Sequence, residues 1–214
     1  MKLQVAFDLM DSFDEVAEKA DKLYGHMNIM EIGTPVIMKL GLDPVRRAKA
    51  AYPEAIILAD CKIADAGYFE AKAAFDAGAD IVTVLGFSDD PTVSGAIRAA
   101  KETGGSIMVD MISVKPQDLA ARMKEIANLG ADYICLHTAK DLQNGSDDPA
   151  ELFSRLTDCA APAKLGLAGG INLSNAKTYA AMKPEVIVVG EGITGADDPV
   201  AVADEFLRIM EEAK

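Results

Sequence analysis

The sequence predicts an α/β fold, a closed (β/α)8 TIM barrel of eight parallel strands ringed by helices. Short apolar runs alternate with longer amphipathic segments from one end of the 214-residue chain to the other. Most of the apolar runs are nearly continuous, which is typical of parallel strands that are buried on both faces. Eight runs of each kind match the element count of a barrel, and the length lies at the short end of the usual range of about 200 to over 400 residues.

Each expected strand is a short run rich in Val, Ile, Leu and Ala. The strands are Leu3–Leu9, Ile29–Gly33, Ala55–Lys62, Ile81–Gly86, Ser106–Ile112, Tyr133–Thr138, Leu165–Gly170 and Val186–Gly190. The same alternation is compatible with an open, doubly wound sheet, which is the alternative fold. No low-complexity linker or break in composition interrupts the pattern, so residues 1–214 are expected to form a single barrel domain.

The segments between the strands carry apolar residues at helical spacing. The expected helices are Phe13–Tyr24, Pro44–Ala51, Tyr68–Ala77, Thr92–Thr103, Gln117–Leu129, Pro149–Leu156, Ser174–Met182 and Val200–Met210. Asp43-Pro44 is a typical helix start, an N-cap followed by proline at the first helical position. Ala77-Gly78-Ala79-Asp80 and Leu129-Gly130-Ala131-Asp132 both place a glycine where a helix ends and a strand begins. Their recurrence indicates a repeated βα unit.

The composition argues against several classes of function. The net charge is −13 at pH 7, which disfavours nucleic acid and anionic membrane surfaces, because both attract basic proteins. A small phosphorylated substrate needs only local donors and is compatible with this charge. The three cysteines are far apart and form no CxxC pair. With no signal peptide and no apolar stretch of about 20 residues, they indicate a soluble cytoplasmic protein.

The most informative stretch is Asp60-Cys61-Lys62-Ile63-Ala64-Asp65, at the end of an expected buried strand. Residues two apart in a strand share a face, so Asp60 and Lys62 are expected to point the same way, with Asp65 at the turn that follows. The flanking carboxylates would keep the Lys62 ammonium protonated. Removing ions from water is costly, so stability alone rarely explains such a group. A site that binds a metal, holds a sugar phosphate and stabilises a negative intermediate would use all three.

Other expected strands also end in polar residues, and the carboxyl ends of barrel strands form the mouth where barrel enzymes carry their active sites. The ionisable residues at these ends are Asp8, Glu31, Asp60, Lys62, Asp110, His137 and Glu191. Structural alternatives exist for several candidates: a satisfied core carboxylate for Asp8, a structural role for His137 and, at the turn after the third strand, a helix N-cap for Asp65. Cys61 and Cys135 are interpreted as packing groups.

Glycines follow the last two expected strands, in Leu167-Ala168-Gly169-Gly170 and Val189-Gly190-Glu191-Gly192. Glycine lets backbone N–H groups approach an anion closely. The usual phosphate site of a barrel is formed by these two loops and the N-terminus of a short helix. The backbone of both turns is therefore a candidate phosphate site, although tight turns also require glycine.

These segments resemble the 3-hexulose-6-phosphate synthases, a family in the orotidine-monophosphate-decarboxylase superfamily of barrels, from Lys2 to the last helix. The resemblance is carried by Lys2-Leu3-Gln4-Val5-Ala6, Glu31-Ile32-Gly33-Thr34-Pro35, the Asp-x-Lys-x-x-Asp motif Asp60/Lys62/Asp65, Ala77-Gly78-Ala79-Asp80, Val82-Thr83-Val84-Leu85-Gly86, Val109-Asp110-Met111-Ile112, His137-Thr138, Asp141-Leu142-Gln143 and Ala168-Gly169-Gly170. The Asp-x-Lys-x-x-Asp motif marks the superfamily. Two segments, Glu31-Ile32-Gly33-Thr34-Pro35 and His137-Thr138, narrow it to the synthases and the related 3-keto-L-gulonate-6-phosphate decarboxylases.

The resemblance implies an aldehyde-lyase that condenses formaldehyde with D-ribulose 5-phosphate to D-arabino-3-hexulose 6-phosphate through an enediolate. It also implies Mg2+ and a homodimer whose active sites are shared across the interface. By the same resemblance, Glu31 and Asp60 hold the metal. Lys62 stabilises the enediolate, and Asp65 reaches into the partner's site.

The resemblance also implies residues for proton transfer and substrate binding. His137 is a proton-transfer or positioning group near the reacting carbons, and Asp110 is a polar contact to the substrate. Backbone N–H groups around Gly169, Gly170, Gly190 and Glu191 cradle the phosphate by the same resemblance. Asp8 and Lys140 are further candidates for substrate binding.

Two residues depart from the family pattern. Glu191 stands where many relatives carry a small residue or an arginine, so it must turn away from the phosphate or pair with a cation. Lys140 stands where the decarboxylases carry arginine, whereas Asp110 stands where they carry glutamate. The synthase is the preferred interpretation, and the alternatives are the decarboxylase and a non-catalytic sugar-phosphate-binding barrel. A ribulose-phosphate epimerase is disfavoured, because the two histidines are too few for its metal site.

Overall fold

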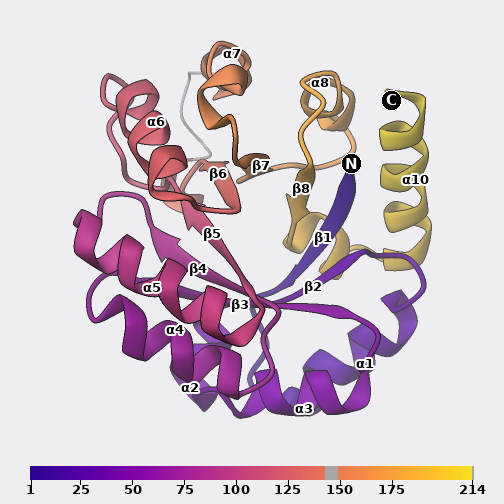
Figure 1. Ribbon diagram of the computed structural model, residues 1–214. Helices are drawn as coiled ribbons and strands as arrows, with labels where there is room; N and C mark the ends of the chain where they lie inside the picture. Colours follow the sequence, from indigo (N-terminus) through magenta and orange to yellow (C-terminus); the bar gives the residue numbers. More distant parts are fainter. Residues whose placement is uncertain (143–148, 214) are drawn as a thin grey trace.

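The computed structural model describes residues 1–142 and 149–213. Within these residues, eight parallel strands form a closed barrel in sequence order, and helices surround it (Figure 1). The expected (β/α)8 TIM barrel is confirmed and the open sheet is wrong. Gln143 of the family segments and Lys214 of the expected domain lie outside the described residues.

The strands begin within one residue of their expected starts. They are β1 (Lys2–Phe7), β2 (Ile29–Ile32), β3 (Ile56–Ile63), β4 (Ile81–Leu85), β5 (Ser106–Asp110), β6 (Tyr133–His137), β7 (Lys164–Ala168) and β8 (Val186–Val189). Apart from β3, each ends one or two residues earlier than expected. The residues that the strands lose, such as Gly169 and Gly190, belong to the loops at the mouth of the barrel.

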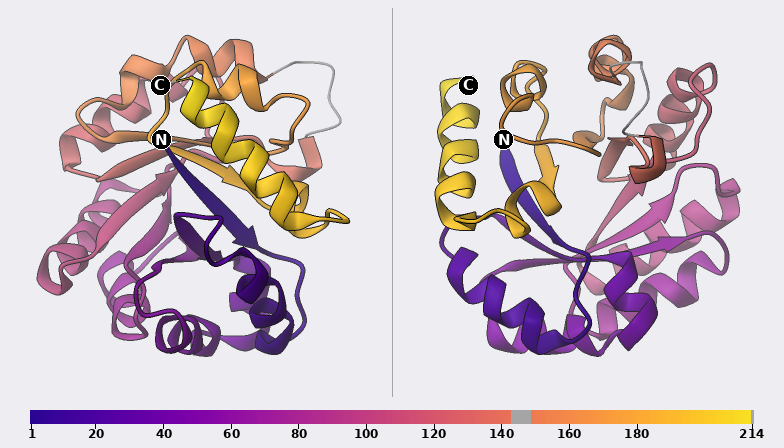
Figure 2. Two further views of the ribbon diagram at one scale, coloured as in Figure 1. Left: turned by 90° about the vertical axis from the view of Figure 1, so that its right-hand side faces the viewer. Right: turned by 180° about the vertical axis from the view of Figure 1, so that it is seen from behind.

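The helices follow the strands around the barrel, and α10 completes the ring by packing on α1 and α8 (Figure 2). The α-helices are α1 (Phe13–Leu23), α2 (Thr34–Leu40), α3 (Asp43–Ala51), α4 (Gly67–Asp76), α5 (Asp90–Thr103), α6 (Leu119–Leu129), α7 (Pro149–Ser154), α8 (Ala176–Ala180), α9 (Glu191–Thr194) and α10 (Pro199–Glu212), with 3-10 turns at Lys140–Leu142 and Thr157–Ala160. Asp43 is the first residue of α3, and Leu42 is its N-cap. Sequence reasoning missed α2 and α9. None of the described helices is long and apolar enough to cross a membrane.

The barrel interior has an apolar layer beneath a polar one. The apolar layer is a buried cluster of Ile29, Leu58, Ile81, Met108, Tyr133, Cys135, Ala168 and Val186. Two residues further along five of these strands come Glu31, Asp60, Thr83, Asp110 and His137. Since residues two apart share a face, these polar side chains also point inward, one level nearer the carboxyl ends. The apolar layer thus supports the polar residues at the mouth.

A repeated contact holds the opposite rim of the barrel. The backbone N–H groups of Leu3, Ile57 and Ile107 donate to the side chains of Asn28, Asp80 and Asp132 at 2.8, 2.8 and 2.9 Å. Each acceptor immediately precedes the next strand, β2, β4 or β6. Gly78 and Gly130, in the two similar turns, have φ of 104° and 95°. The repeated unit predicted from these turns therefore spans two strands.

Candidate functional site

The end of β3 is irregular at the residues of the Asp-x-Lys-x-x-Asp motif. Ala59 pairs with Val82 and Ile63 with Val84, so β3 has two more residues than β4 over this stretch, as in a β-bulge. Lys62 has φ of 45°, a conformation that non-glycine residues rarely adopt. Its backbone N–H donates to Thr83 Oγ1 at 2.9 Å. Asp60 and Lys62 therefore meet because of this irregular backbone. The prediction that simple strand alternation brings them together is wrong.

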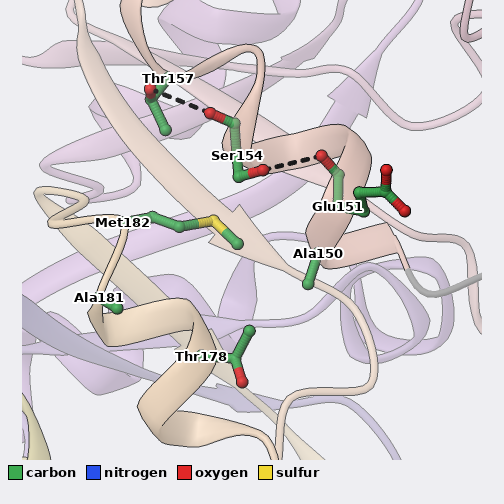
Figure 3. A pocket seen from close by; sticks show the side chains of 7 residues that line it. All are labelled: Ala150, Glu151, Ser154, Thr157, Thr178, Ala181 and Met182. Carbon is green, nitrogen blue, oxygen red and sulfur yellow. Dashed lines mark hydrogen bonds between the residues drawn. The ribbon is translucent and has the colours of Figure 1, made fainter.

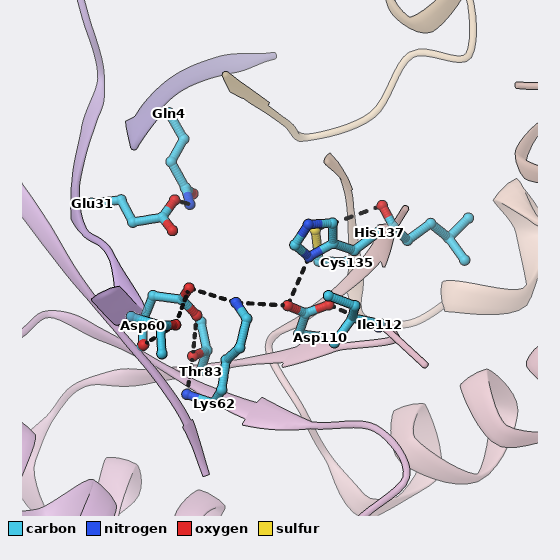
Figure 4. A network of polar contacts seen from close by, with 11 residues as sticks. Gln4, Glu31, Asp60, Lys62, Thr83, Asp110, Ile112, Cys135 and His137 are labelled. Carbon is cyan, nitrogen blue, oxygen red and sulfur yellow. Dashed lines mark hydrogen bonds and ion pairs between the residues drawn. The ribbon is translucent and has the colours of Figure 1, made fainter. Parts of the chain in front are cut away.

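The Lys62 ammonium lies between two buried carboxylates. Its Nζ atom is 2.5 Å from Asp60 Oδ2 and 3.3 Å from Asp110 Oδ2 (Figure 4). Burial alone would lower the pKa of Lys62, but attraction to Asp60, Asp110 and Glu31 outweighs it and raises that pKa. The second carboxylate at this ammonium is thus Asp110, not Asp65. Asp65 is exposed and accepts from the backbone N–H of Ala66 at 2.7 Å.

Three side chains of the described residues hold the Asp60 carboxylate. Thr83 Oγ1 donates to Oδ1 at 2.7 Å, while Thr34 Oγ1 and Lys62 Nζ donate to Oδ2 at 2.7 and 2.5 Å. Sequence reasoning assigned no role to Thr34 or Thr83. Both carried a signal, because Thr34 lies in the family segment after β2 and Thr83 lies two residues beyond Ile81 on the inward face. Asp60 is therefore fixed in one orientation.

Glu31 lies near Asp60 in the barrel interior. It is buried at the end of β2, and its Oε2 accepts from Gln4 Nε2 at 2.6 Å. Burial, followed by repulsion from Asp60 and Asp8, raises the pKa of Glu31 well above its usual range. Burial and repulsion from Asp60 also raise the pKa of Asp8. Figure 4 shows Glu31 and Asp60 directed toward the same space as Lys62, so acidic side chains outnumber the ammonium there.

Glu31 and Asp60 have the donor chemistry to hold a divalent cation. No three His, Cys, Asp or Glu side chains form a metal-binding group in residues 1–142 and 149–213, so these two carboxylates would be the protein ligands. Mg2+ commonly takes one or two carboxylates and keeps several waters. The repulsion that raises the pKa of Glu31 is relieved by a positive charge at this position.

His137, at the end of β6, is oriented by Asp110 at the end of β5. Its Nδ1 lies 2.9 Å from Asp110 Oδ2, and Asp110 Oδ1 accepts from the backbone N–H of Ile112 at 2.9 Å. Burial alone would raise the pKa of Asp110, but His137, Lys62 and the Ile112 amide hold that pKa below its usual value. Because Asp110 is ionised, Nδ1–H donates to it, and Nε2 is left for a ligand (Figure 4).

Asp8 is partly exposed and fits between two loops at the mouth. A Cβ atom on Gly33 would lie 2.0 Å from Asp8 Oδ1, and one on Gly190 would lie 3.0 Å from Oδ2. The glycines after β2 and β8 therefore make room for this carboxylate. Together with its interaction with Asp60, this position places Asp8 in the polar site, against the alternative of a satisfied core carboxylate.

The loops after β6, β7 and β8 form the other side of the mouth. Gly169 and Gly170 have φ of 96° and 68°, and a Cβ atom on Gly169 would lie 2.3 Å from Thr138 O. Lys140 Nζ donates to Glu191 Oε2 at 2.9 Å, and these side chains are 67% and 68% exposed. Glu191 is thus paired with a cation, as the sequence argument required.

A cavity of about 500 Å3 lies outside this site, between α7 and α8 (Figure 3). It is lined by Ala150, Glu151, Ser154, Thr157, Thr178, Ala181 and Met182. The Ser154 hydroxyl donates to Glu151 O at 2.8 Å, and the Thr157 hydroxyl to Ser154 O at 3.5 Å. These local contacts account for two of its polar groups, and the cavity contains none of the predicted site residues.

The chain matches known proteins over almost its whole length. The orotidine 5'-phosphate decarboxylase / HUMPS family matches residues 1–206. A 3-hexulose-6-phosphate synthase of Bacillus subtilis (strain 168) is 41% identical over 98% of this chain and 99% of its own. The crystal structure of 3-hexulose-6-phosphate synthase from Salmonella typhimurium has a TM-score of 0.95 at 38% identity and covers 100% of both chains. The structure of 3-keto-L-gulonate-6-phosphate decarboxylase from Vibrio cholerae, with a TM-score of 0.84 at 20% identity over 100% of this chain and 98% of its own, shares the fold.

Proposed function

This chain belongs to the orotidine 5'-phosphate decarboxylase / HUMPS family, and we propose that it is the synthase that joins formaldehyde to D-ribulose 5-phosphate. It is an enzyme of the lyase class. The product would be D-arabino-3-hexulose 6-phosphate. The observation that carries the proposal is the Lys62 ammonium, held between Asp60 and Asp110 at 2.5 and 3.3 Å beside the buried Glu31. A cytoplasmic location stays a prediction.

The reaction requires an anion to be stabilised. A proton leaves C1 of ribulose 5-phosphate, next to the C2 carbonyl, and an enediolate forms. C1 then attacks the carbon of formaldehyde, a carbon–carbon bond forms, and the formaldehyde oxygen takes up a proton. Lys62 is preorganised to meet the negative charge of the enediolate, and such a donor contributes roughly 3–4 kcal/mol to transition-state stabilisation.

Mg2+ and His137 complete the proposed chemistry. Glu31 and Asp60 would hold the cation, which when bound polarises the substrate oxygens and spreads the negative charge. Asp110 fixes Nδ1 of His137 at 2.9 Å, so Nε2 is the nitrogen that exchanges a proton with the substrate.

The loops after β7 and β8 would bind the phosphate group. Backbone N–H groups around Gly169, Gly170 and Gly190 supply donors. Lys140 lies at the same rim and neutralises Glu191 at 2.9 Å, so the glutamate does not oppose a phosphate dianion. Asp8 would contact the substrate from the loop after β1.

A homodimer with shared active sites is also part of the proposal. Leu9, Met38, Phe69 and Phe87 follow the carboxyl ends of β1 to β4 and are 62%, 80%, 76% and 54% exposed. Exposed apolar side chains of this size are typical of interfaces when they form a patch. The exposed Asp65 lies in the same part of the chain and would reach the partner's site.

Mixing two inactive variants tests the shared site. Lys62→Ala lacks the ammonium, and Asp65→Ala lacks the carboxylate given to the partner. After equal mixing and reassembly, half of the dimers are mixed and each contains one intact site, so about a quarter of the parent activity is expected. Activity that stays at the level of the separate variants would contradict sharing.

The alternative function is decarboxylation of 3-keto-L-gulonate 6-phosphate. Lys140 favours it, and loss of CO2 would leave a similar enediolate for Lys62 to stabilise. The 41% identity to a synthase over nearly the full length supports the first proposal more strongly. The non-catalytic barrel was suggested by Glu191, and the contact of Glu191 with Lys140 removes that reason.

Two assays on the purified protein separate the functions. Ribulose 5-phosphate with formaldehyde should give hexulose phosphate, and 3-keto-L-gulonate 6-phosphate should release CO2 slowly or not at all. Rapid CO2 release without condensation would reject the synthase proposal in favour of the alternative.

A further inference from the structure

Gln4 is a buried polar residue at a level of the barrel where its neighbours are apolar. It lies in β1 opposite Ile29 of β2 and Val188 of β8 and is 2% exposed. An amide in such surroundings is unfavourable unless its hydrogen bonds are made. Packing alone therefore does not explain a glutamine here.

The amide of Gln4 is only half satisfied. Its Nε2 donates to Glu31 Oε2 at 2.6 Å, whereas its buried Oε1 has no partner among the described residues. Buried acceptors without a partner are rare, and each requires an explanation. The orientation of this amide serves Glu31 and leaves its own oxygen unpaired.

Among the described residues, the Glu31 carboxylate accepts a hydrogen bond from one side chain, whereas the Asp60 carboxylate accepts from three. Asp60 receives hydrogen bonds from Thr34, Thr83 and Lys62. Within the described residues, Gln4 is the one hydrogen-bond donor to the Glu31 carboxylate. Without it, no hydrogen bond would oppose the repulsion of Glu31 by Asp60.

We infer that Gln4 is a positioning residue that fixes Glu31 for cation binding. The amide engages one oxygen of the carboxylate and leaves the other directed to the space shared with Asp60. This inference deepens the proposed function and rests on its placement of a divalent cation at Glu31 and Asp60. The unpaired Oε1 of Gln4 is the cost in stability of keeping a donor at this position.

Titration of the free protein with Mn2+, followed by the electron paramagnetic resonance signal of unbound Mn2+, tests the inference without an activity assay. Gln4→Met removes the amide at similar volume, and Gln4→Asn keeps an amide that is too short to reach Glu31. Met108→Leu is the matched control, because it alters the apolar layer without a hydrogen bond. We expect at least tenfold weaker Mn2+ binding in both Gln4 variants, parental binding in the control and melting temperatures close to that of the control.

Raising Mg2+ should restore the kcat of the Gln4 variants, which a packing defect would not allow. Parental Mn2+ affinity in Gln4→Asn would overturn the inference while leaving the cation site intact, and this variant decides the matter if Gln4→Met does not fold. If the parent protein itself binds no Mn2+, with or without ribulose 5-phosphate, the proposed cation site fails and the inference fails with it.

Discussion

Two lysine–aspartate pairs lie at opposite ends of the barrel and differ in their surroundings. At the amino ends of the strands, Lys49 Nζ is 3.0 Å from Asp80 Oδ2, and the side chains are 33% and 39% exposed. At the mouth, Lys62 Nζ is 2.5 Å from Asp60 Oδ2, and the side chains are 24% and 6% exposed. Lys62 also faces Asp110 at 3.3 Å. One carboxylate therefore faces the ammonium of Lys49, whereas two face the ammonium of Lys62. We call the first pair balanced and the second unbalanced.

The balanced pair is tied to the backbone. Lys49 donates to Ala55 O at 3.2 Å, and Asp80 accepts from the Ile57 N–H at 2.8 Å. At the mouth, the Lys62 ammonium is surrounded by several carboxylates, and burial together with repulsion from Asp60 and Asp8 raises the pKa of Glu31. A buried excess of negative charge is unfavourable unless a cation is bound. Unbalanced charge, rather than charge itself, therefore distinguishes the candidate active site from a structural contact.

Removal of the cation should have the largest effect on activity. We expect EDTA to abolish condensation and Mg2+ to restore it, because the carboxylates at the mouth would be left without their counter-charge. The contact between Lys49 and Asp80 at the other rim should not change. Initial rates before and after chelation measure the effect, and full activity in the chelator would show that the Glu31 and Asp60 assignment is wrong.

Replacement of the two lysines compares the pairs directly. Lys62→Ala should lower kcat at least a hundredfold without unfolding the protein, because it removes a preorganised positive charge. Lys49→Ala should leave kcat within about twofold and act on stability alone, because its partners are backbone and Asp80. Steady-state kinetics and thermal unfolding of both variants give the answer, and parental activity of Lys62→Ala would remove Lys62 from the mechanism.

Replacement of one carboxylate at each end separates a catalytic aspartate from a structural one. Asp110→Asn should lower kcat about tenfold to a hundredfold, because an amide no longer selects the His137 tautomer with a proton on Nδ1. Asp80→Asn is the matched control at the other rim and should affect the melting temperature but not kcat. Equal loss of kcat in both variants would show that the carboxylate at the mouth has no special role.

The exposed pair Lys140–Glu191 should give the smallest effect, with opposite signs for its two members. Lys140→Ala should raise the KM for ribulose 5-phosphate about twofold to fivefold, whereas Glu191→Gly should lower it by a similar factor, since exposed ion pairs are weak. Their kcat values should stay close to that of the parent. Changes of KM in the same direction would contradict the proposed neutralisation of Glu191.

Much of the fold could be predicted because buried parallel strands leave a strong signal. Continuous apolar runs gave all eight strands of the barrel, and barrel topology then brought the ends of distant strands together. This topology predicts that Asp60, Lys62, Asp110 and His137 lie at the same end of the barrel. The contacts of Asp110 with Lys62 and His137, at 3.3 and 2.9 Å, follow from the closed barrel, whereas the contact of Lys62 with Asp60 depends on the irregular end of β3.

The remaining features depend on local geometry that composition does not encode. The extra residues in β3 and the φ of 45° at Lys62 have no apolar pattern to mark them. Gln4 is one polar residue in an apolar strand, and its importance is visible only beside Glu31. Asp65 was expected at the Lys62 ammonium, but the chain turns outward before it and Asp110 takes that position.

The rim contacts formed by Asn28, Asp80 and Asp132 divide the barrel into segments. Each of these side chains accepts a hydrogen bond from the strand that precedes its own. Two consecutive strands are therefore the smallest fragment that contains both the donor and the acceptor. A fragment cut after β4 keeps the carboxylate that receives the Ile57 amide, whereas one cut after β3 loses it. Circular permutation or the exchange of segments with a related barrel is therefore better made at the boundaries after even-numbered strands.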